Sequence, residues 1–262
     1  METKDQWNAG VVSIANKKKS SECQDSNHLI VRSDILILSI ADGAGSAIHG
    51  KKGAEIATKI AANKMLEYID ELNISDNIEE NNHNWKEKIY NAATLAKREI
   101  NLIAKKEENK INDYATTFIL IFAYSGKIYV FQIGDGAVIG KYNSGKITSL
   151  TSPEIGDYYN MTDFLTTEKS ISRAKFKCTT KPISALSAFT DGIQALALSP
   201  PDKESEIWKP FLPFFKPLFS FIENCDEKEQ IKLSIKKFLT SDKMIRSTED
   251  DLTLFLAALN KK

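Results

Sequence analysis

The chain has 262 residues, 42% of them hydrophobic and 27% charged, which is the composition of a globular protein that can bury a full core. Its 35 basic and 35 acidic residues cancel, so no overall electrostatic field favours nucleic acid or an anionic membrane. The three cysteines are widely spaced and indicate neither a disulfide framework nor a zinc site, and no stretch reads as a signal core or a membrane span, so we expect a cytoplasmic protein.

The N-terminal region reads as short strands. Residues 10–15, 28–32 and 34–41 are apolar runs rich in Val, Ile and Leu. A Ser-Asp pair separates the last two runs, as the turn of a hairpin does. The sequence therefore predicts one strand followed by a β-hairpin.

Two helices follow these strands. From Ala57 and Ala61 onward, apolar residues recur every four positions, so residues 53–72 are predicted to form an amphipathic helix. Residues 73–84 are polar and rich in Asn, which is typical of a surface loop. A second helix is predicted from Trp85, because apolar side chains again fall on one stripe.

The middle of the chain returns to the pattern of strands. Residues 115–124, 128–134, 137–142 and 146–150 are apolar runs separated by turns that contain glycine. Turns at such close spacing predict an antiparallel meander, with Asp135 in one of them.

The C-terminal part adds further strands and helices. The predicted elements are a strand at 184–190, a helix-like stretch at 193–198, a Pro-rich aromatic segment at 200–222, a helix at 226–240 and a strand at 252–259. No linker or repeat divides the chain, and strands occur both before and after the helix pair. We therefore predict a single α+β domain over residues 1–262, with antiparallel sheets and flanking helices.

The stretch after the hairpin raises a phosphate-binding hypothesis. Gly45, Gly50 and Lys51 have the G-x-x-x-x-G-K spacing, after a strand and before a helix. Such a loop wraps phosphates with backbone N–H groups at a helix N-terminus. However, Lys52 replaces the hydroxyl residue that ligates Mg²⁺, and a meander lacks the parallel sheet of those enzymes. A P-loop nucleotide hydrolase is therefore the less favoured alternative.

Acidic residues recur at the ends of the predicted strands. Asp42, Asp135 and Asp191 each follow an apolar run and precede a glycine, and Asp250 and Asp251 precede the last strand. Each Asp-Gly pair alone is typical of a turn, and Asp135 fits a plain turn best. Converging strand ends would instead gather the carboxylates into a hard-oxygen site for Mg²⁺ or Mn²⁺.

Five stretches carry a family resemblance. In chain order they read "CQDS", "IADGAGSA", "ATTFILIFAYSGKIYVFQIGDGAVI", "SAFTDGIQALAL" and "TEDDLTLFLAAL". In this order they resemble metal-dependent protein phosphatases of the 2C family, over nearly the whole chain, and "ADGAGSA" looks most like a divergent bacterial branch. The resemblance implies a four-layer α-β-β-α sandwich of two antiparallel sheets flanked by helices, with a binuclear Mn²⁺/Mg²⁺ centre at one edge of the sheets.

The resemblance also implies roles for individual residues. By motif position, Asp42 would bridge the two metal ions and Gly43 would supply its carbonyl oxygen. Asp191 and Asp250 would bind one ion, and Asp25 would hold metal-bound water. The residues expected to carry the catalysis are Asp25, Asp42 and Asp191.

Two further points of the motifs bear on the metal ligands. Asp250 is preferred to Asp251 because it occupies the Asp of the family's Asp-Asn-x-Thr pattern, with Thr253 in place. Asp135 matches the position that holds a third metal ion in bacterial relatives. The implied cofactor is thus two ions of Mn²⁺ or Mg²⁺, with a third as an open question.

The implied activity is hydrolysis of phosphoserine and phosphothreonine in proteins, on substrates of a cognate Ser/Thr kinase, with no nucleic-acid or membrane partner. Two departures from the family stand out. Lysines at 17–19 lie where many members carry a phosphate-gripping Arg, and Ala47 lies where many carry a His, with His49 nearby. These departures motivate an alternative, a catalytically weak or inactive relative that binds a phosphoprotein or another partner. Cys23 reads as a small buried residue rather than a nucleophile.

Overall fold

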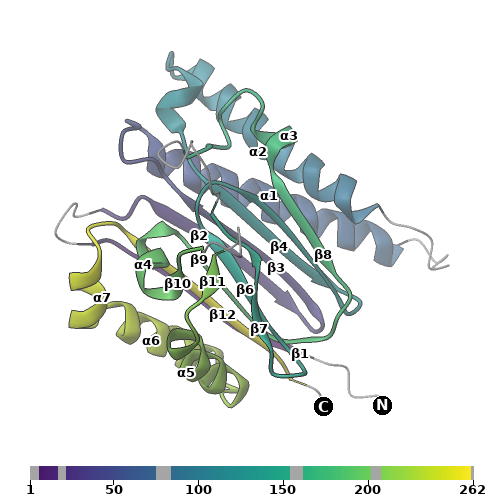
Figure 1. The fold of residues 1–262 in the computed structure, drawn as a ribbon. Helices are drawn as coiled ribbons and strands as arrows, with labels where there is room; N and C mark the ends of the chain where they lie inside the picture. Colours follow the sequence, from purple (N-terminus) through teal and green to yellow (C-terminus); the bar gives the residue numbers. More distant parts are fainter. Residues whose placement is uncertain (1–5, 17–21, 75–83, 154–161, 202–207, 261–262) are drawn as a thin grey trace.

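The computed structural model describes residues 6–16, 22–74, 84–153, 162–201 and 208–260. Over these ranges, two five-stranded sheets lie face to face and helices cover the outer face of each (Figure 1). This is the predicted α+β sandwich of helix, sheet, sheet and helix layers. No helix of the described part combines the length and apolar character that crossing a membrane requires.

The first sheet contains both terminal strands of the described chain. In spatial order its strands are β1 (Gln6–Ile14), β12 (Leu252–Asn260), β9 (Ile183–Phe189), β6 (Ala137–Tyr142) and β7 (Ile147–Thr151). Every neighbouring pair is antiparallel.

The second sheet is also antiparallel throughout its printed pairs. Its strands are β2 (Asp25–Arg32), β3 (Ile35–Asp42), β4 (Phe118–Tyr124), β5 (Lys127–Ile133) and β8 (Lys175–Thr179). The strand β8 was not predicted, because its alternation of polar and apolar residues extends over only five residues, KFKCT, which is too short to stand out from a loop.

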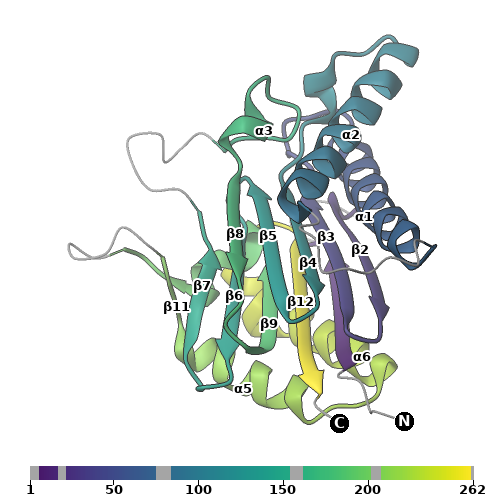
Figure 2. The same cartoon turned by 90° about the vertical axis from the view of Figure 1, so that its right-hand side faces the viewer.

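Four long helices form the outer layers, as the side view also shows (Figure 2). They are α1 (Gly50–Ile74) and α2 (Trp85–Lys106) on the second sheet, and α5 (Leu212–Glu223) and α6 (Lys228–Leu239) on the first. The remaining short elements are η1 (Ile111–Tyr114), α3 (Ser170–Arg173), η2 (Asp191–Ile193), α4 (Gln194–Ala197), β10 (Leu198–Ser199), β11 (Lys209–Pro210) and α7 (Asp242–Ser247).

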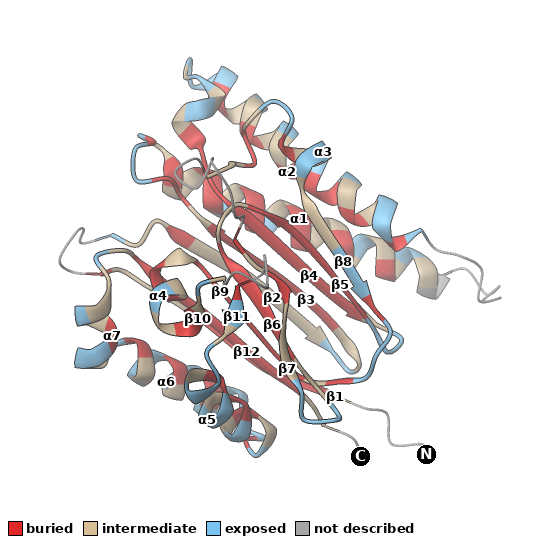
Figure 3. Cartoon of the chain, in the orientation of Figure 1, coloured by how far each residue is buried: buried red, intermediate tan, exposed pale blue. Residues whose placement is uncertain are grey.

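The central strands are buried on both faces, as Figure 3 shows. In β3, Ile37 packs under α1 and α2, while Leu36 and Leu38 face the other sheet. A strand covered on both sides reads as a continuous apolar run, which is why "ILILSIA" was recognisable as one. The buried interior therefore extends along β3 up to Asp42, where the site begins.

The predicted meander is wrong at one turn. Strand β5 pairs with β4 and β8, whereas β6 pairs with β9 and β7, so the chain passes from one sheet to the other at Asp135. The two-residue alternation of a strand is the same in either sheet, so the pattern could not reveal this crossover. The consequence is that Asp135 lies between the sheets and is no plain hairpin turn.

Another difference from the predicted elements concerns the Pro-rich aromatic segment. The Pro-rich segment contains helix α5, with Phe215 and Phe219 buried against the first sheet and Phe211 exposed. These rings therefore mainly cover the core. Most of the Asn-rich loop, with His83, and part of the polar stretch after residue 152 lie outside the described residues.

Candidate metal centre

The site starts from a pair of carboxylates on neighbouring strands. Asp25 is the first residue of β2 and Asp42 the last of β3, and the antiparallel register places them opposite each other. The hairpin turn that sets this register contains Ser33 at a φ of 54°. The carboxyls of Asp25 and Asp42 lie against each other. Two acidic residues distant in the sequence are thus brought together by one turn.

Asp25 also links the two sheets. Its Oδ2 accepts hydrogen bonds from Thr190 Oγ1 at 2.8 Å and from Thr253 Oγ1 at 2.6 Å. Thr190 follows β9 directly and Thr253 lies in β12, so both belong to the first sheet. The side chain of Asp25 is 7% exposed, and its buried Oδ1 reaches no N–H or alcohol donor in the described part of the chain.

Asp191 lies where β9 ends, beside the loop that precedes β12. A side chain at Gly192 would place its Cβ 2.0 Å from the carbonyl oxygen of Asp251, so only glycine allows this approach. Oδ1 of Asp191 is buried and, among the described residues, has no hydrogen-bond partner. The tight contact holds Asp191 next to Asp250, with which it interacts electrostatically.

Asp250 and Asp251 have different environments. Asp251 is buried and uses both oxygens on backbone N–H groups: Oδ1 accepts from Asn16 at 3.0 Å and Oδ2 from Gln24 at 2.6 Å. Asp250 is half-buried, and its Oδ1 accepts from the backbone of Asp251 at 3.0 Å. Asp251 therefore holds the two ends of the loop before β2 and acts electrostatically on Asp25, whereas Asp250 acts on Asp42 and Asp191.

The electrostatics follow from burying like charges together. Burial raises the pKa of Asp42 to about 11, with Asp25 and Asp191 as the next contributions. Burial, then Asp135 and Asp250, raise the pKa of Asp191 to about 7. For Asp25, burial raises the pKa to about 6, although hydrogen bonds from two threonines favour its charged form. A cation is what such a cluster lacks to be stable in its ionised form.

The structure brings the five predicted aspartates into one neighbourhood. They are Asp25, Asp42, Asp135, Asp191 and Asp250, each of which interacts electrostatically with at least one other. Gly43, the sixth predicted residue, follows Asp42 and donates its N–H to the carbonyl of Gln24 at 3.2 Å. Over the described ranges, no group of three or more His, Cys, Asp or Glu side chains is arranged to hold a metal ion. The type of donor nevertheless suits a hard cation, because Oδ1 of Asp25 and Oδ1 of Asp191 are buried carboxylate oxygens without a hydrogen-bond partner in the described part of the chain.

The stretch with the G-x-x-x-x-G-K spacing does not fit a phosphate cradle. The backbone N–H groups of Ala44, Ala47 and His49 all donate to backbone carbonyls. Lys51 pairs with Glu22 at 2.5 Å, and Lys52 pairs with Glu107. The antiparallel sheets also differ from the parallel sheet that a P-loop hydrolase needs. Three backbone N–H groups of the loop and both lysines are therefore engaged within the chain.

Two other polar residues do not join the cluster. The His49 ring packs on Tyr114, with 4.9 Å between ring centroids, and its Nε2 lies 3.1 Å from Asn109 Nδ2, so it faces η1 and the loop between α2 and η1. Burial, then the charges of nearby acids, raise the pKa of Cys23 to about 12, which disfavours a thiolate nucleophile. The lysines at 17–19 lie outside the described residues.

The sequence did not reveal the role of Thr190. Its hydroxyl is the donor that joins the end of β9 to Asp25, and it also accepts from the backbone of Thr253 at 3.2 Å. The available signal was a hydroxyl residue directly before the Asp-Gly pair at the end of an apolar strand.

Comparison with known proteins identifies the family. Residues 15–240 match the family model described as Protein phosphatase 2C. The chain is 31% identical to Serine/threonine-protein phosphatase 3 of Escherichia coli (strain K12) over 259 residues, which covers 95% of this chain and 96% of that protein.

Solved structures share the fold. The serine/threonine phosphatase Stp1 from Staphylococcus aureus superposes with a TM-score of 0.63 at 14% identity, covering 100% of this chain and 98% of that one. The catalytic domain of the serine/threonine protein phosphatase PstP, in complex with two manganese ions, gives a TM-score of 0.59 at 13% identity, covering 98% and 100%. The sandwich fold and the acidic strand ends agree with these matches. The chain therefore belongs to the protein phosphatase 2C family.

Proposed function

We propose that the acidic cluster holds two divalent cations, Mn²⁺ or Mg²⁺, and that the chain hydrolyses phosphoserine and phosphothreonine in proteins. The observation that carries this proposal is the buried cluster itself. Oδ1 of Asp25 and Oδ1 of Asp191 are buried without a hydrogen bond in the described part of the chain, and the pKa of Asp42 is raised to about 11 by burial and by its acidic neighbours. Bound cations would offset both costs.

The names of the relatives support the same function. The Escherichia coli relative and the structural neighbours are serine/threonine phosphatases, and the PstP structure contains manganese. All ligands proposed here are carboxylate or carbonyl oxygens, which suit Mn²⁺ and Mg²⁺ better than softer metals.

The assignment of ligands follows from the contacts of each acid. Asp42, at the centre of the interactions, is proposed to contact both ions, with the carbonyl oxygen of Gly43 beside it. Asp191 and Asp250 are proposed to bind one ion together. Asp251 is left out because its two oxygens already accept backbone hydrogen bonds. Asp135 is the proposed ligand of a third ion.

The chain's own residues prepare the reaction. Two cations together would lower the pKa of a water molecule and neutralise the charge of a phosphoryl group. Asp25, fixed through Oδ2 by two threonine hydroxyls, keeps Oδ1 available to orient that water by hydrogen bonding. No covalent intermediate on the protein is required, which agrees with the raised pKa of the Cys23 thiol.

Further parts of the proposal concern the protein's setting. We infer one domain over residues 1–262, supported by the pairing of β1 with β12. Balanced charge supports a protein substrate over nucleic acid or an anionic membrane. We further propose that the protein is cytoplasmic and that a Ser/Thr kinase phosphorylates its substrates.

Hydrolysis of p-nitrophenyl phosphate and of phosphoserine and phosphothreonine peptides tests the function. We expect Mn²⁺-dependent turnover that chelation abolishes and that Asp191→Ala lowers by roughly 10³-fold, equivalent to about 4 kcal/mol of transition-state stabilisation. The matched control is Asp70→Ala, which removes an acid from the surface ion pair with Arg32 and should leave the rate unchanged.

Other outcomes would contradict the proposal. Turnover that is unaffected by Asp191→Ala, or that persists after chelation, would place the reaction elsewhere. Phosphopeptide binding without any Mn²⁺-dependent turnover would instead indicate a phosphoprotein-binding relative without catalytic activity.

A further inference from the structure

One buried amide on β5 is unexplained by packing. Gln132 is 1% exposed, and its neighbours Phe131 and Ile133 are buried apolar residues. Burial of a carboxamide costs free energy unless its hydrogen bonds are satisfied. An apolar residue would be the default in this strand, so the hydrogen bonds of Gln132 indicate what it does.

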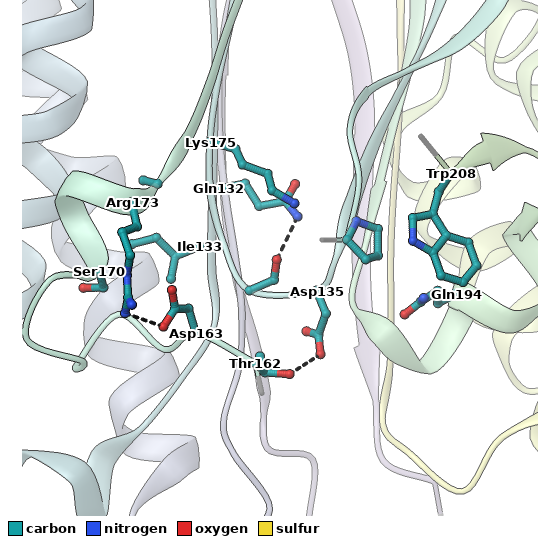
Figure 4. A pocket seen from close by; sticks show the side chains of 13 residues that line it. Gln132, Ile133, Asp135, Thr162, Asp163, Ser170, Arg173, Lys175, Gln194 and Trp208 are labelled. Carbon is teal, nitrogen blue, oxygen red and sulfur yellow. Dashed lines mark hydrogen bonds and ion pairs between the residues drawn. The ribbon is translucent and has the colours of Figure 1, made fainter. Parts of the chain in front are cut away.

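Both hydrogen bonds of the Gln132 side chain go to the turn that carries Asp135, and Figure 4 draws the one to Gly134. Nε2 donates to the carbonyl of Gly134 at 3.0 Å and to the carbonyl of Gly136 at 2.6 Å. These are the carbonyls on either side of Asp135. Oε1 of Gln132 is buried and, in the described ranges, accepts no hydrogen bond. The amide therefore acts only as a donor, and only on this turn.

The turn itself is wedged between the strand ends that carry the other acids. Gly134 has a φ of 102°, and a Cβ there would lie 2.7 Å from Cβ of Thr117. Thr117 in turn exchanges two hydrogen bonds with the backbone of Asp42, at 2.8 and 3.0 Å. On the other side, Ala137 pairs with Phe189, close to Asp191.

The carboxylate of Asp135 is also held by a hydrogen bond from a residue beyond the turn. Its Oδ2 accepts a hydrogen bond from Thr162 Oγ1 at 2.7 Å, which Figure 4 shows across the pocket from Gln132. Both Gln132 and Thr162 line this pocket, whose volume is about 130 Å³. The backbone on either side of Asp135 is thus fixed by an amide, and the carboxylate of Asp135 by a hydroxyl.

We propose that Gln132 is a positioning residue that holds Asp135 toward the acidic cluster and so sets the affinity of the cation site that Asp135 serves. The proposal rests on the proposed function, because it takes Asp135 as a metal ligand. Without the amide, the two carbonyls lose their shared donor and the turn between the sheets can widen. Loss of a residue that orients a metal ligand typically weakens metal binding by about 10- to 100-fold.

Calorimetric titration of the chelator-treated protein with Mn²⁺ tests the proposal in a double-mutant cycle. The variants are Gln132→Met, which keeps the shape and removes the donor, Asp135→Asn, and the two together. We expect each single variant to weaken the same, weakest Mn²⁺ site by about tenfold or more. We expect the double variant to be no weaker than Asp135→Asn alone, because Gln132 acts through Asp135.

A matched control separates positioning from general loss of a buried polar group. Ser187→Ala removes a buried hydroxyl in the middle of β9 that has no hydrogen-bond partner among the described residues, and it should leave Mn²⁺ binding unchanged. Gln132→Glu keeps the size but, as a carboxylate, loses both donors. It should weaken the same site if Gln132→Met proves too unstable to measure.

The outcomes distinguish failure of the positioning role of Gln132 from failure of the proposed function. Effects of Gln132→Met and Asp135→Asn that multiply in the double variant would overturn the positioning role, as would unchanged Mn²⁺ affinity in both Gln132 variants while Asp135→Asn binds more weakly. A wild-type protein that binds no Mn²⁺ would contradict the proposed function itself.

Discussion

Leu38 and Asp42 belong to the same strand, β3, but their surroundings have opposite effects on stability. Leu38 is 0% exposed and packs between the two sheets with other apolar side chains. Asp42 is largely buried among other carboxyls, which raise its pKa to about 11 together with burial. The middle of the strand therefore stabilises the fold by removing apolar surface from water, while its end opposes folding in the absence of a cation.

This difference shows where the sequence departs from what stability alone would select. Between the sheets, local pattern, packing and burial agree. At the acidic end, carboxylates are placed where asparagine or an apolar residue would be more stable. Such a conflict is expected at a functional site, where stability is lower than it could be in exchange for activity.

The largest effects should come from exchanging side chains within β3. In chelator-treated protein, Leu38→Ala should lower the free energy of unfolding by about 3 kcal/mol, because it leaves a cavity between the sheets. Asp42→Asn should raise that free energy by about 2 kcal/mol while abolishing turnover, because Asp42, with its pKa raised to about 11, must take up a proton to be buried at neutral pH and asparagine need not. Urea denaturation measures both. Destabilisation by Asp42→Asn under these conditions would contradict the opposite effects of Leu38 and Asp42 on stability.

The adjacent acids Asp250 and Asp251 should differ in the same way, one in its effect on stability and the other in its effect on metal binding. Asp251→Ala should lower the free energy of unfolding by about 3 kcal/mol, because two backbone N–H groups lose a charged acceptor. Asp250→Ala should change stability by less than about 1 kcal/mol but weaken Mn²⁺ binding. Denaturation and Mn²⁺ titration of both variants check this. A reversal of the two phenotypes would move the metal ligand to Asp251.

The pH dependence of the chelator-treated protein follows from the raised pKa values. Asp191 has a pKa of about 7 and Asp25 of about 6, above the value of about 3.9 in an unfolded chain. The folded state binds these protons more tightly, so their contribution to stability is complete below pH 4 and is lost as the pH rises through 6 to 7. These two groups together should lower the free energy of unfolding by about 4 kcal/mol between pH 5 and pH 8. Asp42, with a pKa of about 11, should add to the same slope, and thermal unfolding measures the loss.

The control for this prediction is the amide at the same position. Asp191→Asn should reduce the loss of stability by about 2 to 3 kcal/mol, because this group no longer titrates while Asp25 and Asp42 still do. Equal slopes in the wild type and the variant would show that Asp191 does not carry the effect.

The smallest effect on stability and turnover is expected for Lys51, in the stretch with the G-x-x-x-x-G-K spacing. Lys51→Ala should change the free energy of unfolding by no more than about 0.5 kcal/mol, because the Glu22 pair is exposed to solvent. Turnover should stay within a factor of about two. Thermal unfolding with and without nucleotide provides the measurement. Nucleotide-dependent stabilisation lost in Lys51→Ala would revive the nucleotide hydrolase interpretation.

Strands and helices could be predicted well from local patterns, but the assignment of strands to sheets could not. The run from Ile35 to Asp42 was predictable because a strand buried on both faces is apolar throughout. The crossover at Asp135 was not, because a turn within one sheet and a turn between two sheets have the same Asp-Gly sequence. Only the tertiary pairing of β6 with β9 distinguishes them.

The same limit applies to the site. Asp42, Asp135 and Asp191 were visible because each follows an apolar run, whereas Asp25 and Asp250 were assigned by their positions in the family motifs. The contributions of Thr190 and Gln132 were hidden, because their partners, Asp25 and the carbonyls around Asp135, become neighbours only when the two sheets meet. Residue type and spacing therefore predict the acidic donors, whereas the residues that orient them depend on tertiary geometry.

Thermal unfolding with and without Mn²⁺, in the wild type and in Asp42→Asn, tests the central claim most directly. With Mn²⁺ at about 100 times its dissociation constant, each site should stabilise the wild type by roughly 2.7 kcal/mol. Asp42→Asn should start from a higher unfolding temperature in chelator and gain far less from Mn²⁺. An equal gain in both proteins, or no gain in the wild type, would contradict the account of these buried aspartates as a metal centre.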